Sequence, residues 1–390
     1  MLLTGTGRLA PAGLSPWALV VRDGRIAWVG PPEAVPRATA IDEHFDLGSA
    51  LVTPGLIDSH THPVFAGDRS DEAAARLEGA PHTDRGILRT MRATRAADDQ
   101  LLEALLEARL RAALEAGTTT VECKSGYGLS LAEELRHLRI IRRVADRLPI
   151  RVISTFLGAH AVPPEARSMD EYVAHVADDM IPAVARDGLA DFVDIFADEG
   201  FFDPVSTERI GRAALAAGLG LRLHADQISR TGAAELGARL GAASVDHLEQ
   251  LDADGVATLA GSSTVATLLP GPAMVLRSRL PPARALVDAG ATVALATDAN
   301  AGTYGGFGTM PLVIGLGATL LGLTVTEALR AATHGGARAL ALGDVGGLEP
   351  GMTADLVAWD AEHEGSFALR LGSIRPSRAW LSGEEVDIGA

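Results

Sequence analysis

Short apolar segments alternate with longer segments rich in alanine, leucine and arginine through most of this 390-residue chain. Eight of the apolar segments have the length and composition of β-strands. They recur at intervals of roughly 22 to 35 residues over most of the series, which is room for one strand, one helix and two loops, and eight such units close into an α/β barrel of the (β/α)8 type. The predicted strands are 55–62, 117–124, 151–160, 192–199, 221–226, 244–249, 263–270 and 292–299.

The interval after the first predicted strand is longer than the others and holds an insertion at residues 63–100. A doubly wound open sheet is the alternative arrangement for alternating strands and helices. A nucleotide-binding version of that fold carries a G-x-G-x-x-G motif after its first strand, and this chain has none there. The barrel is therefore the favoured fold class.

Both ends of the chain carry patterns of short β-strands. Predicted strands at 18–21 and 25–29 flank the hairpin turn Asp23-Gly24, and similar patterns recur at 354–359 and 378–381. Neither end is long enough for a stable sheet domain, so we expect one small β-sandwich built from both. The predicted division is residues 1–53 plus 352–390 for the sandwich and 54–351 for the catalytic barrel.

The composition limits the possible partners and location. A formal net charge of -16 would repel nucleic acid and anionic membrane surfaces. The longest apolar stretch, 310–325, is interrupted by Pro311 and is shorter than the ~20 residues that a membrane span needs. The start of the chain lacks an export signal, and a single cysteine, Cys123, excludes an internal disulfide, so we expect a cytoplasmic protein.

The carboxyl ends of the strands in such a barrel meet at the active-site face, so the polar residues there are informative. Histidines are concentrated at these ends, whereas only His137, His175 and His334 are expected on helices. The polar or turn residues at the predicted strand ends are His60 and His62, Lys124 with Tyr127 just beyond, His160, Asp198 with Glu199, His224, His247, Pro270-Gly271 and Asp298.

Four of these residues, His60, His62, His224 and Asp298, are suitable ligands for a catalytic zinc or ferrous ion with one position left for water. Residues two apart on a strand share one face, so both histidines of the H-x-H pair can reach the same ion. Such an ion lowers the pKa of bound water to ~7 and polarises a carbonyl group. Hydrolysis is therefore the expected reaction.

Two residues are candidates for proton transfer and charge stabilisation. Asp298 could both contact the metal and take a proton from water, and His247 could hydrogen-bond the hydroxide or the developing oxyanion. The alternatives are a helix N-cap for Asp298 and a structural hydrogen bond to Asp246 or Glu249 for His247.

Residues 54–62, the histidines at predicted strands five and six, and Ala296-Thr297-Asp298 resemble the amidohydrolase superfamily. Binuclear members bridge two metals through a carbamylated lysine at the end of strand four. The only lysine here, Lys124, is on the second predicted strand, so the resemblance implies a mononuclear site unless Glu199 substitutes. Mononuclear deaminases carry a glutamate three residues after the strand-five histidine; Gln227 stands there and cannot protonate a leaving amine.

Longer and more specific motifs lie at 64–72, 124–129, 155–165, 224–227 and 246–249. They resemble the imidazolonepropionase family, and the resemblance covers both the barrel and the flanking β domain. The resemblance implies a hydrolase acting on a cyclic amide C–N bond. It would open 4-imidazolone-5-propanoate to N-formimino-L-glutamate in histidine degradation, with one Zn²⁺ or Fe²⁺.

The same resemblance implies the residues that contact the substrate. A planar guanidinium such as that of Arg69 pairs bidentately with a propanoate carboxylate, and an amide such as Gln227 offers donor and acceptor to a cyclic amide. The alternatives are a surface ion pair of Arg69 with Asp68 or Asp71, a packing role for Tyr127 and a turn role for Gly302. The implied set is Arg69, Tyr127, His160 and Gln227 for the substrate, Asn300, Gly302 and Thr303 for substrate or product, and Asp298, His247 and Gln227 for catalysis.

The loops around the substrate depart from the family pattern more than the metal ligands do. Ala301 replaces the proline of the family's D-x-N-P-G loop, and His82 stands where a tyrosine is common. The glycine-rich run of the family is reduced to Gly86, and 271–277 lacks the expected aromatic residues.

The expected partner is a small anionic substrate, with no nucleic acid or membrane partner, and a homodimer is one possible assembly. Two alternative functions remain open. Another mononuclear amidohydrolase, a deaminase or lactam hydrolase, would keep the metal site without needing Arg69. A non-catalytic binding barrel would show no turnover at all.

Overall fold

The computed structural model describes residues 1–37, 41–79 and 85–389. At its centre, eight parallel strands follow one another in chain order, and each overlaps one of the eight predicted ranges; seven lie wholly within their range, and β10 begins one residue before its own. The prediction of a (β/α)8 barrel is therefore confirmed. The strands are β6 (Leu56–Asp58), β7 (Thr118–Lys124), β8 (Arg151–Ala159), β9 (Phe192–Ala197), β10 (Gly220–Ala225), β11 (Ser244–His247), β12 (Val265–Leu268) and β13 (Val293–Leu295).

The barrel closes between its first and last strands through the residues that follow them. The amide of Asp298 donates to the carbonyl oxygen of His60, and the amide of His62 donates to the carbonyl oxygen of Ala299, both at 2.9 Å. The first strand ends at Asp58, earlier than predicted, so the two histidines flank an isolated bridge residue, Thr61, instead of lying within the strand. The two backbone segments that close the barrel therefore also carry candidate metal ligands.

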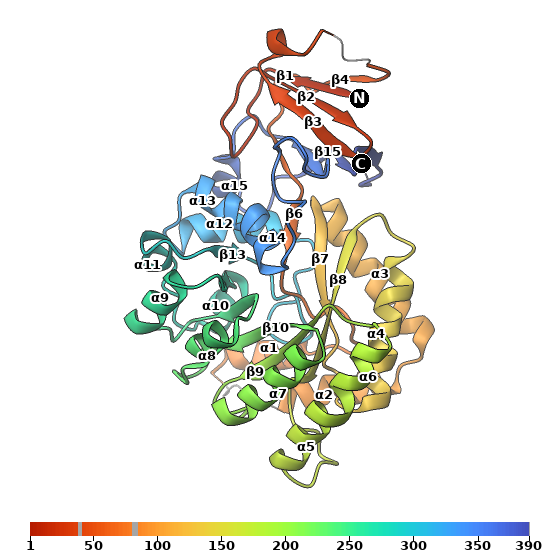
Figure 1. Ribbon diagram of the computed structural model, residues 1–390, viewed down its shortest axis with the longest axis vertical. Helices are drawn as coiled ribbons and strands as arrows, with labels where there is room; N and C mark the ends of the chain where they lie inside the picture. The colour runs from red at the N-terminus through yellow and green to blue at the C-terminus, as the bar shows by residue number, and fades with distance from the viewer. Residues whose placement is uncertain (38–40, 80–84, 390) are drawn as a thin grey trace.

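Helices surround the barrel, as Figure 1 shows. Several begin at a polar cap, as where the Asp98 carboxylate accepts a hydrogen bond from the Leu101 amide. Among the described residues, no helix is both long enough and apolar enough to cross a bilayer. The helices after the insertion are α3 (Asp99–Glu115), α4 (Leu131–Ala145), α5 (Met169–His175), η2 (Val176–Met180), α6 (Ile181–Arg186), α7 (Pro204–Ala216), α8 (Ala233–Leu240), α9 (Ala253–Ala260), α10 (Pro270–Leu276), α11 (Ala283–Asp288), α12 (Met310–Thr319), α13 (Val325–Arg330), η3 (Ala331–Gly335) and α14 (Gly336–Ala339).

The predicted insertion contains two further helices, α1 (Ser70–Leu77) and α2 (Arg85–Ala96). Arg109 of α3 binds the loop that leads into α1. This guanidinium donates to the carbonyl oxygens of Pro63 and Phe65 at 2.6 and 2.8 Å and lies 3.5 Å from the centre of the Phe65 ring. The insertion is thereby held over the mouth of the barrel.

Two four-stranded sheets are built from the two ends of the chain, and Figure 1 places both termini there. Their side chains share one core cluster, which includes Leu3, Trp17, Leu356 and Trp380, each 0% exposed. The domain boundaries given above remain a prediction. The strands are β1 (Leu2–Gly5), β2 (Trp17–Arg22), β3 (Arg25–Gly30) and β4 (His44–Asp46) in one sheet, and β5 (Val52–Pro54), β14 (Leu356–Trp359), β15 (Pro376–Leu381) and β16 (Glu384–Val386) in the other, with η1 (Pro32–Ala34) and α15 (Ser366–Leu369) in the connections.

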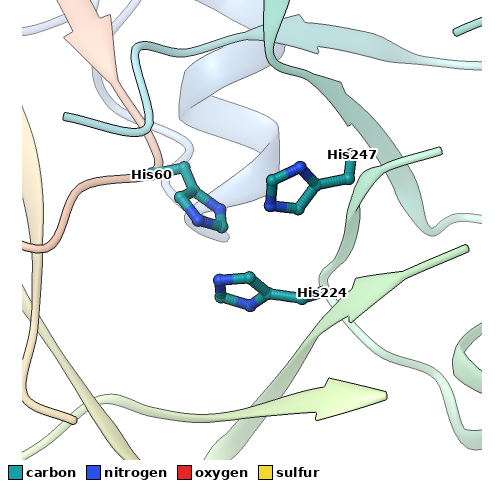
Figure 2. Close-up of side chains that lie close together, drawn as sticks. All are labelled: His60, His224 and His247. Carbon is teal, nitrogen blue, oxygen red and sulfur yellow. The ribbon is translucent and has the colours of Figure 1, made fainter. Parts of the chain in front are cut away.

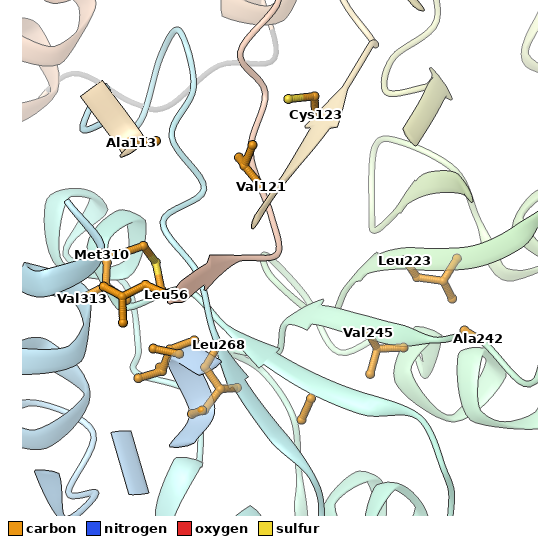
Figure 3. Packing of buried hydrophobic residues seen from close by; sticks show 14 of the residues in the cluster. Leu56, Ala113, Val121, Cys123, Leu223, Ala242, Val245, Leu268, Met310 and Val313 are labelled. Carbon is orange, nitrogen blue, oxygen red and sulfur yellow. The ribbon is translucent and has the colours of Figure 1, made fainter. Parts of the chain in front are cut away.

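The main apolar core lies between the barrel strands and the helices that surround them. Figure 3 shows Val245 and Leu268 on neighbouring strands and, from α12, Met310 and Val313 in the same packed layer. Burying a side chain of this size contributes roughly 1.5–3 kcal/mol. This layer fixes the strand ends that carry the functional side chains.

Candidate active site

A cavity of about 370 Å³ opens at the carboxyl ends of the barrel strands. Most of the residues singled out from the sequence line it, although they come from seven separate segments of the chain. His60 is fully buried beneath it, and Gly302 lies behind the Arg69 side chain. The predicted residues in the cavity wall are His62, Arg69, Tyr127, His160, His224, Gln227, His247, Asp298, Asn300 and Thr303.

The four proposed metal ligands converge at the floor of this cavity. Nε2 of His62 lies 3.2 Å from Nε2 of His60 and 3.3 Å from Nε2 of His224. Oδ1 of Asp298 lies 3.3 Å from Nε2 of His62 and 3.7 Å from Nε2 of His60. Figure 2 shows the rings of His60 and His224 together with His247, which completes a second group of close donors.

These separations fit a bound divalent ion. With metal–nitrogen bonds of about 2.0–2.1 Å, two ligands of a tetrahedral site lie about 3.3 Å apart. The two measured Nε2–Nε2 distances, 3.2 and 3.3 Å, match that edge. The chemistry of the donors, imidazole nitrogen with one carboxylate oxygen, is also that of zinc and ferrous sites.

Two of the imidazoles are held by carboxylates on their far side. Nδ1 of His60 donates to Asp246 at 2.6 Å, and Nδ1 of His224 donates to Asp194 at 3.1 Å. A proton on Nδ1 leaves the lone pair of Nε2 directed into the site. Burial, followed by the nearby charge of Lys124 and the other imidazoles, holds the pKa of His60 well below its usual value, so this ring is neutral as a metal ligand must be.

Asp298 has a strained backbone, with φ at +49°, and its side chain is directed at the imidazoles. Burial raises the pKa of its carboxyl group, although the neighbouring histidines oppose that rise. The alternative role as a helix N-cap is wrong, because the next helix, α12, begins after Thr309.

His247 also has a positive φ, +82°. Although burial lowers the pKa of its imidazole, the carboxylate of Glu249, with Nδ1 and Oε1 at 3.6 Å, outweighs burial and the pKa is raised. Of the two acids considered as structural partners, Asp246 instead binds His60 and Arg222. His247 is thus a ring that can carry a proton beside the metal ligands.

Neither of the two groups considered for bridging a second metal is placed to do so. Lys124 is fully buried, with Nζ 2.6 Å from Glu122 and 2.7 Å from Asp194. Glu199 is exposed and does not line the cavity. The geometry therefore favours one ion.

Arg69 is 7% exposed, and its Nε and Nη2 pair with Glu72 at 3.0 and 2.9 Å. The alternative of a surface ion pair with Asp68 or Asp71 is wrong, since Asp71 pairs with Arg89. The guanidinium passes between two glycines: a Cβ would lie 1.6 Å from Nη2 at Gly86 and 2.1 Å from Nη1 at Gly302. Gly302 is therefore more than a turn residue.

Tyr127, His160 and Gln227 present hydrogen-bonding groups to the cavity. The buried carboxylate of Glu134 accepts hydrogen bonds from the amides of Gly126, Gly128 and Leu129, which fixes the loop carrying Tyr127. Nδ1 of His160 donates to the carbonyl oxygen of Gly126 at 2.9 Å, so its Nε2 is an acceptor. These groups line the cavity together with Gln227.

Asn300 organises the loop beyond Asp298. Its Oδ1 accepts from the amides of Gly302 and Thr303, both at 2.8 Å, and its Nδ2 donates to the carbonyl oxygen of Asp298 and to Oγ1 of Thr303. Ala301 lies in this loop, whereas His82 lies outside the described residues. The hydrogen-bonding atoms of the Asn300 side chain are thus used mainly within the loop, at residues 298–303.

Several cavity residues were not found from the sequence. Arg76 follows Arg69 by seven residues, which is two turns of α1, so helical spacing could have indicated it. The stacked rings of Phe196 and Phe201, with centroids 3.9 Å apart, have no comparable sequence signal. The missed residues in the wall are Arg76, Ile87, Phe196, Phe201, Ile228, Gln250, Leu276 and Ser278.

Comparisons with known proteins show the family to which the chain belongs. Residues 68–386 match the model of the amidohydrolase family. Imidazolonepropionase of Methylobacterium sp. strain 4-46 is 47% identical over 361 residues, which is 91% of this chain and 90% of that protein. Imidazolonepropionase of Pseudomonas putida strain GB-1 is 45% identical over 95% of this chain and 94% of that protein.

Solved structures share the fold at lower identity. The 5-methylcytosine deaminase of Klebsiella pneumoniae with phosphonocytosine superposes with a TM-score of 0.80 at 18% identity, over 99% of this chain and 98% of that one. An adenosine deaminase of Xanthomonas campestris with bound zinc gives a TM-score of 0.73 at 20% identity, over 98% and 92%. On the family match and the identity to curated relatives, the chain belongs to the amidohydrolase family and, within it, to the imidazolonepropionases.

Proposed function

We propose that this protein hydrolyses 4-imidazolone-5-propanoate to N-formimino-L-glutamate with a single divalent ion. The observation that carries the proposal is the placement of four convergent metal donors at the floor of a cavity whose wall contains the guanidinium of Arg69. The curated relatives named above are imidazolonepropionases.

In the proposed reaction, water adds to the ring carbonyl carbon, the adjacent ring C–N bond breaks, and the released nitrogen takes up a proton. An ion held by His60, His62, His224 and Asp298 supplies Lewis acidity, which lowers the pKa of water and polarises the carbonyl. Asp298, whose carboxyl pKa is raised by burial, accepts a proton from the water. His247, whose pKa is raised by the nearby Glu249 in spite of burial, stabilises the negative charge on the carbonyl oxygen.

The remaining wall residues bind and orient the substrate. Nη1 of Arg69 is the guanidinium nitrogen that Glu72 does not hold, and it binds the propanoate carboxylate. Tyr127 and the free Nε2 of His160 hydrogen-bond the substrate, and Gln227 contacts the cyclic amide. Asn300, Gly302 and Thr303 shape the loop beside the carboxylate.

A deaminase is not favoured, because Gln227 lacks the acidic proton that a leaving amine needs. The ion in this proposal is Zn²⁺ or Fe²⁺. The proposal also includes a cytoplasmic location and a homodimeric assembly.

One experiment separates the alternatives. The purified protein is analysed for metal and then assayed with the imidazolone, and product is identified by mass. One ion per chain with formation of formiminoglutamate supports the proposal. One ion without turnover of the imidazolone points to another substrate, and a barrel that holds no ion and turns over nothing is a binding protein.

A further inference from the structure

Beneath the metal donors, the barrel interior contains five charged side chains, Glu122, Lys124, Asp194, Arg222 and Asp246, which we call the charge network. All five are 0% exposed. They come from β7, β9, β10 and β11. Bulky branched residues usually fill the interior of such a barrel, so a charged layer there is unusual.

The members of the charge network are joined by short contacts. Nζ of Lys124 lies 2.6 Å from Glu122 and 2.7 Å from Asp194. Nη2 of Arg222 lies 2.9 Å from Asp246, and its Nε lies 3.4 Å from Glu122. Each cation thus bridges two of the three carboxylates.

Two of those carboxylates are the groups that hold the metal-facing imidazoles. Asp194 accepts from Nδ1 of His224, and Asp246 accepts from Nδ1 of His60. Lys124 is therefore connected to His224 through Asp194, and Arg222 to His60 through Asp246.

The charge network also holds the backbone on both sides of His60. Arg222 donates from Nη2 to the carbonyl oxygen of Ser59 at 2.6 Å. The amide of Thr61 donates to Glu122 at 3.2 Å, and its hydroxyl donates to the Glu122 carbonyl oxygen. The position of this ligand is thereby fixed at its ring and at both neighbouring peptide groups.

Stability alone does not account for such an arrangement. Replacing a buried ion pair by apolar residues is often neutral or stabilising, because desolvation of the charges offsets their attraction. Groups that hold the far nitrogen of a ligand imidazole, in contrast, fix its tautomer and orientation and typically change metal affinity by about 10–100-fold.

We propose that Lys124 and Arg222 are positioning residues of the metal centre, which act through Asp194 and Asp246 to hold His224 and His60 in the geometry that binds the ion. The inference rests on the proposed metal site. It assigns a function to the only lysine of the chain, which does not line the cavity.

The test measures metal affinity directly, without turnover. Zn²⁺ affinity is determined by chelator competition, and the visible spectrum of the Co²⁺-substituted protein reports ligand geometry. Lys124→Met is expected to weaken Zn²⁺ binding by about 10–100-fold and to alter the Co²⁺ spectrum. Leu138→Ala, a fully buried apolar truncation in α4, is the matched control and should lower the melting temperature with affinity and spectrum unchanged.

A variant that does not fold is replaced by a more conservative substitution in the same network. Asp194→Asn probes the Lys124 link. Arg222→Lys keeps the charge while removing the guanidinium fork, whose Nη2 donates to Asp246 and to the Ser59 carbonyl oxygen and whose Nη1 donates to the Ala339 carbonyl oxygen. Zn²⁺ affinity within twofold of wild type and an unchanged Co²⁺ spectrum in the folded variants would overturn the inference alone. Failure of the wild-type protein to bind one ion would instead overturn the proposed function.

Discussion

The guanidinium of Arg69 lies against the backbone of Gly302, so that a Cβ at position 302 would come within 2.1 Å of Nη1 and 2.3 Å of Cζ. Glycine at this position is therefore a steric requirement for the arginine, and the two residues form one structural unit. The proposed carboxylate site can therefore be tested by substituting either residue.

Gly302→Ala is expected to displace Arg69 and to raise KM for the imidazolone by about tenfold, the equivalent of one lost charge-assisted hydrogen bond of about 1.5 kcal/mol. Gly305→Ala is the matched control, because its Cβ would have only the Asn300 carbonyl oxygen as a neighbour, at 4.0 Å. Steady-state kinetics of both variants decide the matter. Equal KM values in the two would argue against the steric coupling.

Arg69→Met should lower kcat/KM by about tenfold or more for each bond lost, at about 1.5–3 kcal/mol per charge-assisted bond, and should leave the metal bound. Arg89→Met removes another partner of Glu72 but is 44% exposed and does not line the cavity, so it should leave kinetics almost unchanged. An Arg69→Met protein with wild-type kcat/KM would remove the arginine from the site and weaken the assignment of an anionic substrate.

His224→Ala should lose the ion and the activity together, because it removes one of three convergent imidazole donors. His175→Ala, on the exposed surface of α5, is the control and should retain both. Metal content by elemental analysis is the measurement. Stoichiometric metal in His224→Ala, or two ions per wild-type chain, would contradict the mononuclear site.

Gln227 should make this a ring hydrolase without deaminase activity, because an amide orients a substrate but does not deliver an acidic proton to a leaving amine. Ammonia release from cytosine, guanine and adenosine is measured alongside imidazolone hydrolysis, and we expect it to be slow or absent. Comparable rates of the two reactions would exclude this interpretation of Gln227.

His137 should make the protein less stable in mild acid. It is fully buried in α4, and burial lowers its pKa from 6.5 to about 3, so below pH 6.5 the unfolded chain binds a proton that the folded chain does not. The free energy of unfolding therefore falls as the pH drops, with a limiting slope of about 1.4 kcal/mol per pH unit.

Between pH 6.5 and 5, this histidine should account for a loss of about 1.5 kcal/mol that is absent in His137→Leu. Urea unfolding of both proteins at the two pH values is the measurement. His175→Leu, on the exposed face of α5, should keep the wild-type dependence. The same pH dependence in His137→Leu as in wild type would show that other groups cause it.

The sequence alone determined the barrel and the residues at its active face. Strand and helix periodicity are local properties, and each of the eight predicted strand ranges overlaps a barrel strand. Because parallel strands of a barrel end at one face, the order of the strands is enough to bring the histidines at positions 60, 62, 160, 224 and 247 together.

Only the tertiary structure decided which neighbours these residues have. The sequence offers Asp246 as a partner of the adjacent His247, but it binds His60, 186 residues away in the chain. It likewise offers Asp68 and Asp71 as partners of Arg69, yet this arginine reaches Glu72 and passes between Gly86 and Gly302. Contacts of this kind arise from barrel closure and loop packing, and a periodic pattern along one strand holds no information about side chains on another.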